Sequence, residues 1–199
     1  MVKSTNERKL EKQQHIQNLI FDTTTRLMKR YTFDEITVRM ICADAGISVG
    51  MFYRNFSTKA EILSFFYQKA LQDYKGILDT QTQLTFKEKL TSYYLWIVSY
   101  TAGFGQDFIK HFYTPDNKAI KADSENNEIA ALSNLILQQA VDEGEYVLPG
   151  HRQIIEITHE FLILVKGILL DWYINEGAYD LLSYASDYLK RVINTLLYY

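Results

Sequence analysis

Apolar residues recur at intervals of three and four positions along most of the chain, which is the spacing of amphipathic helices. Ser4 and Glu7 form a capping-box pattern, and the apolar positions after it predict a first helix that runs to about Tyr31. The 199 residues include only 9 Gly and 2 Pro, too few for the many turns of a sandwich or barrel. The pattern therefore predicts an all-α fold.

Two short helices joined by a tight turn follow the first helix. Thr37 is a suitable N-cap for a helix that ends at Ala45. Gly46 can adopt the positive φ that ends this helix, and Ser48 can cap a third helix over Val49–Asn55. This spacing is typical of a helix-turn-helix, in which the second helix of the pair enters the major groove of DNA.

The rest of the chain predicts a larger helical body. We place the boundary after residue 60, so that residues 1–60 form a three-helix head and residues 61–199 form the body. The body helices are expected from Ser57 or Thr58 onward, after Thr85, over Phe108–Tyr113 and Ile129–Val141, and in two long closing segments, about Arg152–Glu176 and Tyr179–Leu197.

The net charge of −3 is unevenly distributed. Residues 1–60 hold 10 Lys and Arg against 6 Asp and Glu, whereas residues 61–199 hold 11 against 18. A positive head on an acidic body suits a protein that presents one end to a polyanion, although an excess of this size is modest.

Cysteine usage and hydropathy bear on location. The single Cys42 excludes an intramolecular disulfide framework and a cysteine-only zinc site, and fits a reducing compartment. The chain has no run of 18 apolar residues, and its polar N-terminus lacks the apolar core of a signal peptide. We therefore expect a cytoplasmic protein without a membrane partner.

Motifs for catalysis or cofactor binding are missing from the sequence. The pair Glu156 and His159 has the spacing of half of a helical di-iron site, but the second pair that such a site needs is absent. The sequence has no phosphate-binding loop and no nucleophile elbow, and its four His are scattered. We expect no enzyme activity, no cofactor and no metal.

The second short helix carries side chains suited to DNA. A small tip of low charge, Val49 to Met51, can approach base edges, and the residues after it supply hydrogen-bond donors. Basic side chains near the helix N-termini at Thr37 and Thr58 are candidates for phosphate contacts. The predicted DNA contacts are Thr37, Arg39, Ser48, Val49, Gly50, Met51, Tyr53, Arg54, Asn55 and Lys59.

Over residues 9–66 the chain resembles the TetR family of bacterial transcriptional regulators. The resemblance is carried by the segment Phe33–Lys59, and its anchors are Thr37, Gly46-Ile47-Ser48, Gly50, Tyr53, Phe56 and Lys59. Two positions depart from the family pattern. Cys42 stands where alanine is usual and suits the core as a small hydrophobe, while Asn55 stands where His is common and bears on sequence preference or phosphate contact.

The resemblance implies a homodimer that binds a near-palindromic operator and is released from it by a small-molecule effector, most often as a repressor. It also implies that the body holds the effector pocket and pairs two subunits through its last two helices. The aromatic residues in mid-chain are either core residues or pocket residues; the pocket candidates are Tyr93, Trp96, Tyr100, Phe104, Phe108 and Phe112. The dimer candidates are Phe161, Val165, Trp172, Leu181, Tyr188 and Val192.

Two alternatives have the same fold. In one, the body has become a protein-interaction or structural platform and DNA binding is nonspecific or lost. In the other, the chain is a helical ligand carrier, which would leave the head motif unexplained. The sequence does not specify the operator, the regulated genes, the effector, the role of Cys42, or whether binding represses or activates.

Overall fold

In the computed structural model, the described residues are 4–115, 117 and 128–197, and every regular element among them is an α-helix. The expected all-α fold is confirmed. The helices are α1 (Thr5–Leu27), α2 (Val38–Ala45), α3 (Val49–Asn55), α4 (Glu61–Ser64), α5 (Phe66–Leu78), α6 (Phe86–Ala102), α7 (Gln106–Phe112), α8 (Glu128–Asp142), α9 (Ile154–Ile174) and α10 (Leu181–Leu196).

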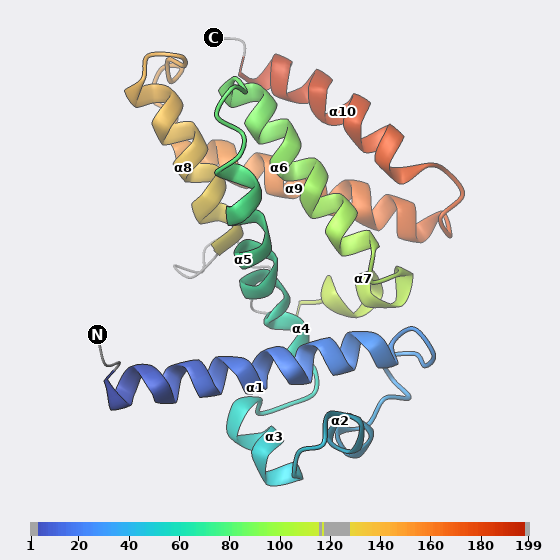
Figure 1. The fold of residues 1–199 in the computed structure, drawn as a ribbon. Coiled ribbons are helices and arrows are strands. Elements are labelled where there is room, and N and C mark those ends of the chain that lie inside the picture. The colour runs from blue at the N-terminus through green and yellow to red at the C-terminus, as the bar shows by residue number, and fades with distance from the viewer. Residues whose placement is uncertain (1–3, 116, 118–127, 198–199) are drawn as a thin grey trace.

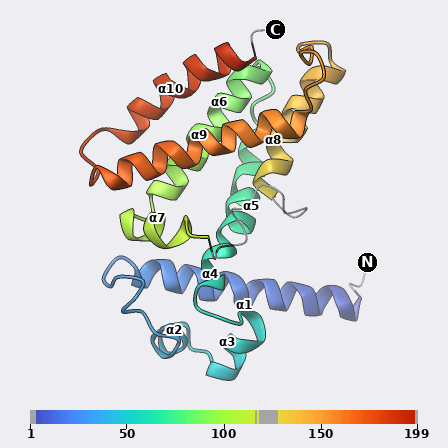
Figure 2. The same ribbon diagram turned by 180° about the vertical axis from the view of Figure 1, so that it is seen from behind.

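The molecule has a small head and a larger helical body (Figures 1 and 2). Helix α1 lies across the end of the body, with α2 and α3 on its far side and α4 leading from the head into α5. Helix α6 is central in the body, where it contacts α5, α7, α8, α9 and α10. Buried apolar side chains form one continuous cluster from Ile20 in α1 to Leu197 after α10. The division at residue 60 therefore stays a prediction, because the core is shared across it.

Helix α1 begins as expected and ends earlier than expected. The Ser4 side chain accepts from the Glu7 N–H while the Glu7 carboxylate accepts from the Ser4 N–H, so the predicted capping box is confirmed. The helix ends at Leu27 and not near Tyr31. The N–H groups of Lys29 and Arg30 bond to carbonyls three residues back, which tightens the chain into a turn.

The helix expected from Ser57 or Thr58 is shorter and broken. The Thr58 hydroxyl caps the Glu61 N–H at 3.2 Å, while the Glu61 carboxylate accepts from the Ser57 N–H at 2.5 Å. The first helical stretch therefore begins only at Glu61, and it is interrupted at Phe65, whose N–H bonds back to Ile62. This break separates α4 from α5.

The later body helices lie where the sequence placed them. Thr85 and Glu88 form a capping box at the start of α6. Helices α9 and α10 are each a few residues shorter than expected, because Gln153 and Asp180 take the N-cap positions. A buried hydroxyl network joins three of these helices: the Tyr94 hydroxyl lies 2.5 Å from the Ser133 hydroxyl, which also accepts from Thr158 at 3.1 Å.

Candidate nucleic-acid interface

Helices α2 and α3 have the predicted bounds, and the reason is local. The Thr37 hydroxyl accepts from the Met40 N–H at 3.2 Å, and the Ser48 hydroxyl accepts from the Met51 N–H at 3.1 Å. Gly46 ends α2 with φ of 65°. Glycine adopts this left-handed conformation without strain, whereas a residue with a Cβ would be strained there. Two hydroxyl caps and one glycine therefore define a helix-turn-helix.

An aromatic cluster holds α3 against the rest of the head. Phe52 and Phe56 are buried, as predicted. The Phe56 ring meets Phe65 edge-on at 5.9 Å between centroids, and Phe65 meets Phe21 of α1 in the same way at 6.0 Å. These contacts fix the buried side of α3 and leave its opposite side facing away from α1.

The outward side of α3 carries several of the predicted DNA contacts. Val49 is 41% exposed and Tyr53 is 56% exposed, with Ser48, Gly50 and Arg54 also exposed beside them. A Cβ built on Gly50 would meet nothing closer than the Ser48 hydroxyl at 4.0 Å. Packing within the protein therefore does not require glycine at this position. The absence of a side chain instead leaves room for a molecule that binds to the exposed side of α3.

The other predicted contacts on α2 and α3 differ in how accessible they are. Thr37 and Arg39 are exposed at the start of α2. Met51 is half-buried, and so is Asn55, whose amide donates to the Met51 carbonyl at 2.8 Å. Arg54 uses its Nε on the Gly50 carbonyl at 3.2 Å, which orients the guanidinium along the exposed side of α3.

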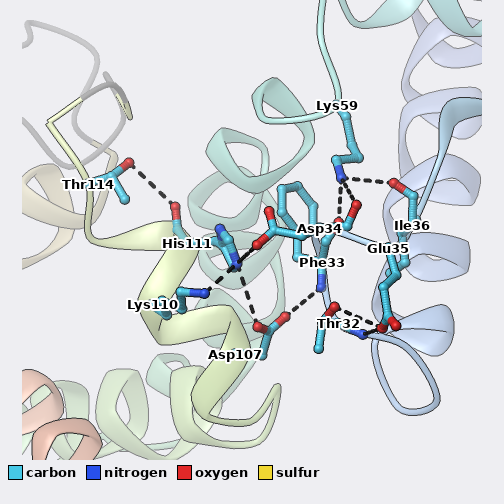
Figure 3. Close-up of polar contacts among 10 residues, drawn as sticks. All are labelled: Thr32, Phe33, Asp34, Glu35, Ile36, Lys59, Asp107, Lys110, His111 and Thr114. Carbon is cyan, nitrogen blue, oxygen red and sulfur yellow. Dashed lines mark hydrogen bonds and ion pairs between the residues drawn. The ribbon is translucent and has the colours of Figure 1, made fainter.

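Lys59 has a task that the sequence did not indicate. Its ammonium donates to the carbonyls of Phe33 and Ile36, the latter at 2.8 Å, and lies 4.3 Å from the centre of the Phe33 ring (Figure 3). Burial lowers the pKa of Lys59, against the opposing effect of Asp34 and Asp107. These bonds, with a longer one to the Asp34 carbonyl at 3.5 Å, anchor the turn before α2, and the expected phosphate contact of Lys59 stays a prediction.

Cys42 is buried on the inner side of α2. Desolvation raises the pKa of its thiol, which favours the neutral form over the reactive thiolate. Its position agrees with the expected core packing.

Of the six pocket candidates, Tyr93, Phe108 and Phe112 are buried in the core, while Trp96, Tyr100 and Phe104 are partly buried and pack against it. Consecutive rings from Trp96 through Tyr100, Phe104 and Phe108 to Phe112 have centroids 4.9 to 5.2 Å apart. We call this series the aromatic ladder. Tyr93 connects to this ladder through Tyr74, whose ring contacts both Tyr93 and Trp96, and the Tyr93 hydroxyl donates to the Ile129 carbonyl at 2.7 Å. Phe104 also lines a cavity of about 370 Å³ between α1 and the end of α6.

A larger cavity lies elsewhere in the body. It has a volume of about 650 Å³ and opens between α8 and the start of α9, with Leu135, Leu148 and Ile155 among its apolar lining residues and Asn134 and Arg152 among its polar ones. Arg152 forms an ion pair with Glu160 at 2.5 Å.

The six dimer candidates divide into two groups. Phe161, Val165 and Leu181 are buried within the subunit, whereas Trp172, Tyr188 and Val192 are partly exposed. The exposed apolar residues of α9 are Ile155, Ile163 and Ile174, and those of α10 are Leu182 and Tyr184. Sequence periodicity could not separate the two groups, because α9 is apolar on more than one side.

The described residues were expected to lack a membrane-spanning helix and a metal site. No helix among them is long and apolar enough to cross a membrane. They include no cluster of three or more His, Cys, Asp or Glu that could hold a metal ion.

Fold and site together define the class: a helix-turn-helix protein with a helical body. Residues 20–64 match the profile of the family described as bacterial regulatory proteins, tetR family, so the TetR resemblance of the head is confirmed. No curated protein sequence matches the chain significantly.

Solved structures share the fold at low sequence identity. FadR from Bacillus subtilis, a transcriptional regulator solved with stearoyl-CoA, is 19% identical with a TM-score of 0.62, over 88% of this chain and 96% of that one. FadR from Bacillus halodurans, a fatty acid degradation regulator, is 14% identical with a TM-score of 0.60, over 89% and 93%. The TetR family regulator PfmR from Thermus thermophilus is 17% identical with a TM-score of 0.54, over 88% and 97%. The whole chain therefore has a TetR-like fold, and the family match with the helix-turn-helix supports a DNA-binding regulator.

Proposed function

We propose that the protein is a sequence-specific transcription regulator, most simply a cytoplasmic repressor, that leaves a near-palindromic operator when a small molecule binds its body. The observation that carries this proposal is the outward side of α3. It combines a small tip around Gly50 with donors at Ser48 and Arg54 and an exposed Tyr53. Such a surface fits the major groove, where donors read base edges and hydroxyls meet phosphates.

The protein acts as a homodimer in this proposal. Ile155, Ile163 and Ile174 on α9 are each more than half exposed. Together they form an exposed apolar surface on this helix, and burial of such a surface against a second subunit is favourable. With Leu182 and Tyr184 of α10, and the partly exposed Trp172, Tyr188 and Val192, they form the proposed interface. A two-fold dimer would present two recognition helices about 34–36 Å apart or a multiple of this, which predicts a palindromic site.

The effector in this proposal is apolar or aromatic, at least in the part that enters the body. Its site includes the aromatic ladder, whose rings would have to part to admit it, or the open cavity between α8 and α9. An acyl-CoA is one candidate, because the FadR structure from Bacillus subtilis contains stearoyl-CoA. Titration with stearoyl-CoA and with CoA alone, read as release of bound operator, tests this class.

Selection of genomic DNA fragments by the purified protein at near-physiological salt tests the proposed function. The wild type is expected to enrich a short palindrome, and the double variant Arg39→Ala/Tyr53→Ala is expected to enrich none. Lys190→Ala, which removes an exposed positive charge on α10 far from α3, serves as the matched control.

The alternative function, a platform with nonspecific DNA binding, gives a different result. No sequence would then be enriched, and binding to any fragment would fall steeply with salt, since counterion release dominates nonspecific binding. Repeating the selection with refolded, ligand-stripped protein separates this outcome from an effector that holds the released state.

A further inference from the structure

The turn that leads into the helix-turn-helix is held from the body as well as from the head. Asp107 of α7 accepts a hydrogen bond from the backbone N–H of Phe33 at 2.6 Å, although the two residues are 74 positions apart (Figure 3). His111, one turn further along α7, packs its ring against Phe33 at 5.2 Å between centroids. Helix α7 thus contacts both the backbone and the side chain of Phe33.

Charged groups strengthen this contact. The His111 Nε2 lies 3.5 Å from a carboxylate oxygen of Asp34 and 3.5 Å from one of Asp107. Lys110 lies 3.8 Å from Asp34. Asp34 belongs to the head and the other three residues belong to α7, so the charges on the two sides of the contact are complementary whenever the imidazole is protonated.

Lys59 holds the same turn from the opposite direction. Its ammonium bonds to the carbonyls of Phe33 and Ile36 and lies over the ring that His111 touches on another side. Phe33 is only 4% exposed between them. Because Thr37, the cap of α2, lies four residues after Phe33, the position of Phe33 helps to set where α2 begins relative to the body.

Helix α7 is a firm support for this contact. Its Phe108, Ile109 and Phe112 are buried in the core, and it packs against α6 and α9. The covalent route from head to body runs through α4 and the break at Phe65. Buried apolar contacts also join head and body, and the hydrogen bond from Phe33 to Asp107 adds an attachment with a defined direction. The edge-on contact between the Phe21 and Phe104 rings is one of these apolar contacts, and it is less directional than a hydrogen bond.

We propose that Asp107 and His111 form a latch that fixes the orientation of the head on the body. They are positioning residues that do not touch DNA. This inference rests on the proposed function, a dimeric regulator with a palindromic operator. In such a dimer the latch holds the two recognition helices at the separation of the half-sites. Without it, binding has to order two mobile heads and the preference for one spacing weakens.

The test compares operators of different spacing. Dissociation constants are measured by fluorescence anisotropy for the selected operator, for versions with one or two base pairs added between the half-sites, and for one half-site alone. Asp107→Ala and His111→Ala are expected to weaken binding to the native spacing by roughly tenfold. Both variants should bind the altered spacings and the half-site as the wild type does. Asp79→Ala, which removes an exposed carboxylate at the end of α5, away from α7 and from the proposed dimer interface, is the matched control.

Two results would overturn the latch. An equal loss on every DNA, including the half-site, would show that the variants damage α2 and α3 themselves. An unchanged preference for spacing would show that the head is fixed by other contacts. Thermal unfolding of each variant establishes that the fold is intact.

A second measurement needs neither DNA nor a dimer. Spin labels at Ala43→Cys on α2 and Lys190→Cys on α10, in a Cys42→Ala background and diluted with excess unlabelled Cys42→Ala protein, report the distance between head and body within one chain. The Asp107→Ala variant is expected to broaden the distance distribution, and an unchanged distribution would refute the latch. If the wild type selects no operator, the proposed function fails, while this distance still decides whether the latch exists.

Discussion

Lys59 provides the sharpest test of how the head is built, because the sequence predicts a phosphate contact for it and the structure shows its ammonium bonded to the turn before α2. We consider Lys59→Met, which keeps most of the aliphatic stem and removes the ammonium. The variant loses hydrogen bonds from the ammonium to the carbonyls of Phe33 and Ile36 and the contact with the Phe33 ring. It leaves these carbonyls with water as the replacement partner.

The magnitude follows from two opposing effects. A hydrogen bond from a charged donor contributes about 1.5–3 kcal/mol, and a cation over an aromatic ring about 0.5–1 kcal/mol at an exposed site. Burial opposes these gains, as the lowered pKa of Lys59 shows, and methionine avoids that cost. We expect a net loss of about 2–3 kcal/mol in the free energy of unfolding.

Urea unfolding followed by circular dichroism measures this loss, with Lys190→Met as the control for removing an exposed Lys. Operator affinity is measured in parallel, at temperatures where each variant is fully folded. The reasoning is refuted if Lys59→Met unfolds with the wild-type midpoint yet binds every DNA sequence more weakly by the same factor. That result would indicate that Lys59 contacts the phosphate backbone of DNA and contributes little to the stability of the head.

Three further changes have distinct expected outcomes. Gly50→Ala should stabilise α3, by up to about 1 kcal/mol in thermal unfolding, because a Cβ fits the protein there; operator binding should nevertheless weaken, since the Cβ faces the DNA. Arg54→Ala should cost roughly 1–3 kcal/mol more on the operator than on unrelated DNA, measured by competition binding, and an equal loss on both would make Arg54 a backbone contact. Tyr94→Phe should lower the free energy of unfolding by about 1–2 kcal/mol without changing DNA affinity, because it removes one member of a buried hydroxyl network in the body.

The sequence was most informative where structure is decided locally. Thr37, Gly46 and Ser48 each act on residues within one turn, so the bounds of α2 and α3 could be predicted from them. The late start of α4 at Glu61 could not, because Thr58 and Glu61 have the pattern of a capping box while the Glu61 carboxylate bonds to Ser57.

The candidate site was only partly predictable for a related reason. The role of Lys59 depends on carbonyls 23 and 26 positions away, and the contact of Asp107 with Phe33 spans 74 positions. No short-range pattern records such pairs. The burial of Phe161 in α9 likewise depends on the neighbouring helices. Because α9 has apolar residues on more than one side, periodicity alone does not show which of them face the core.

In the head, the residues that would contact DNA are different from the residue that attaches the head to α7. Tyr53 and Arg54 contact their own helix, whereas the orientation of that helix depends on the backbone of Phe33. The surface that would choose a DNA sequence is therefore chemically independent of the joint that would set its placement. Exchanging the outward residues of α3 should redirect the protein to a new target while its response to the body is inherited unchanged, which makes this head a candidate for building sensors with chosen outputs.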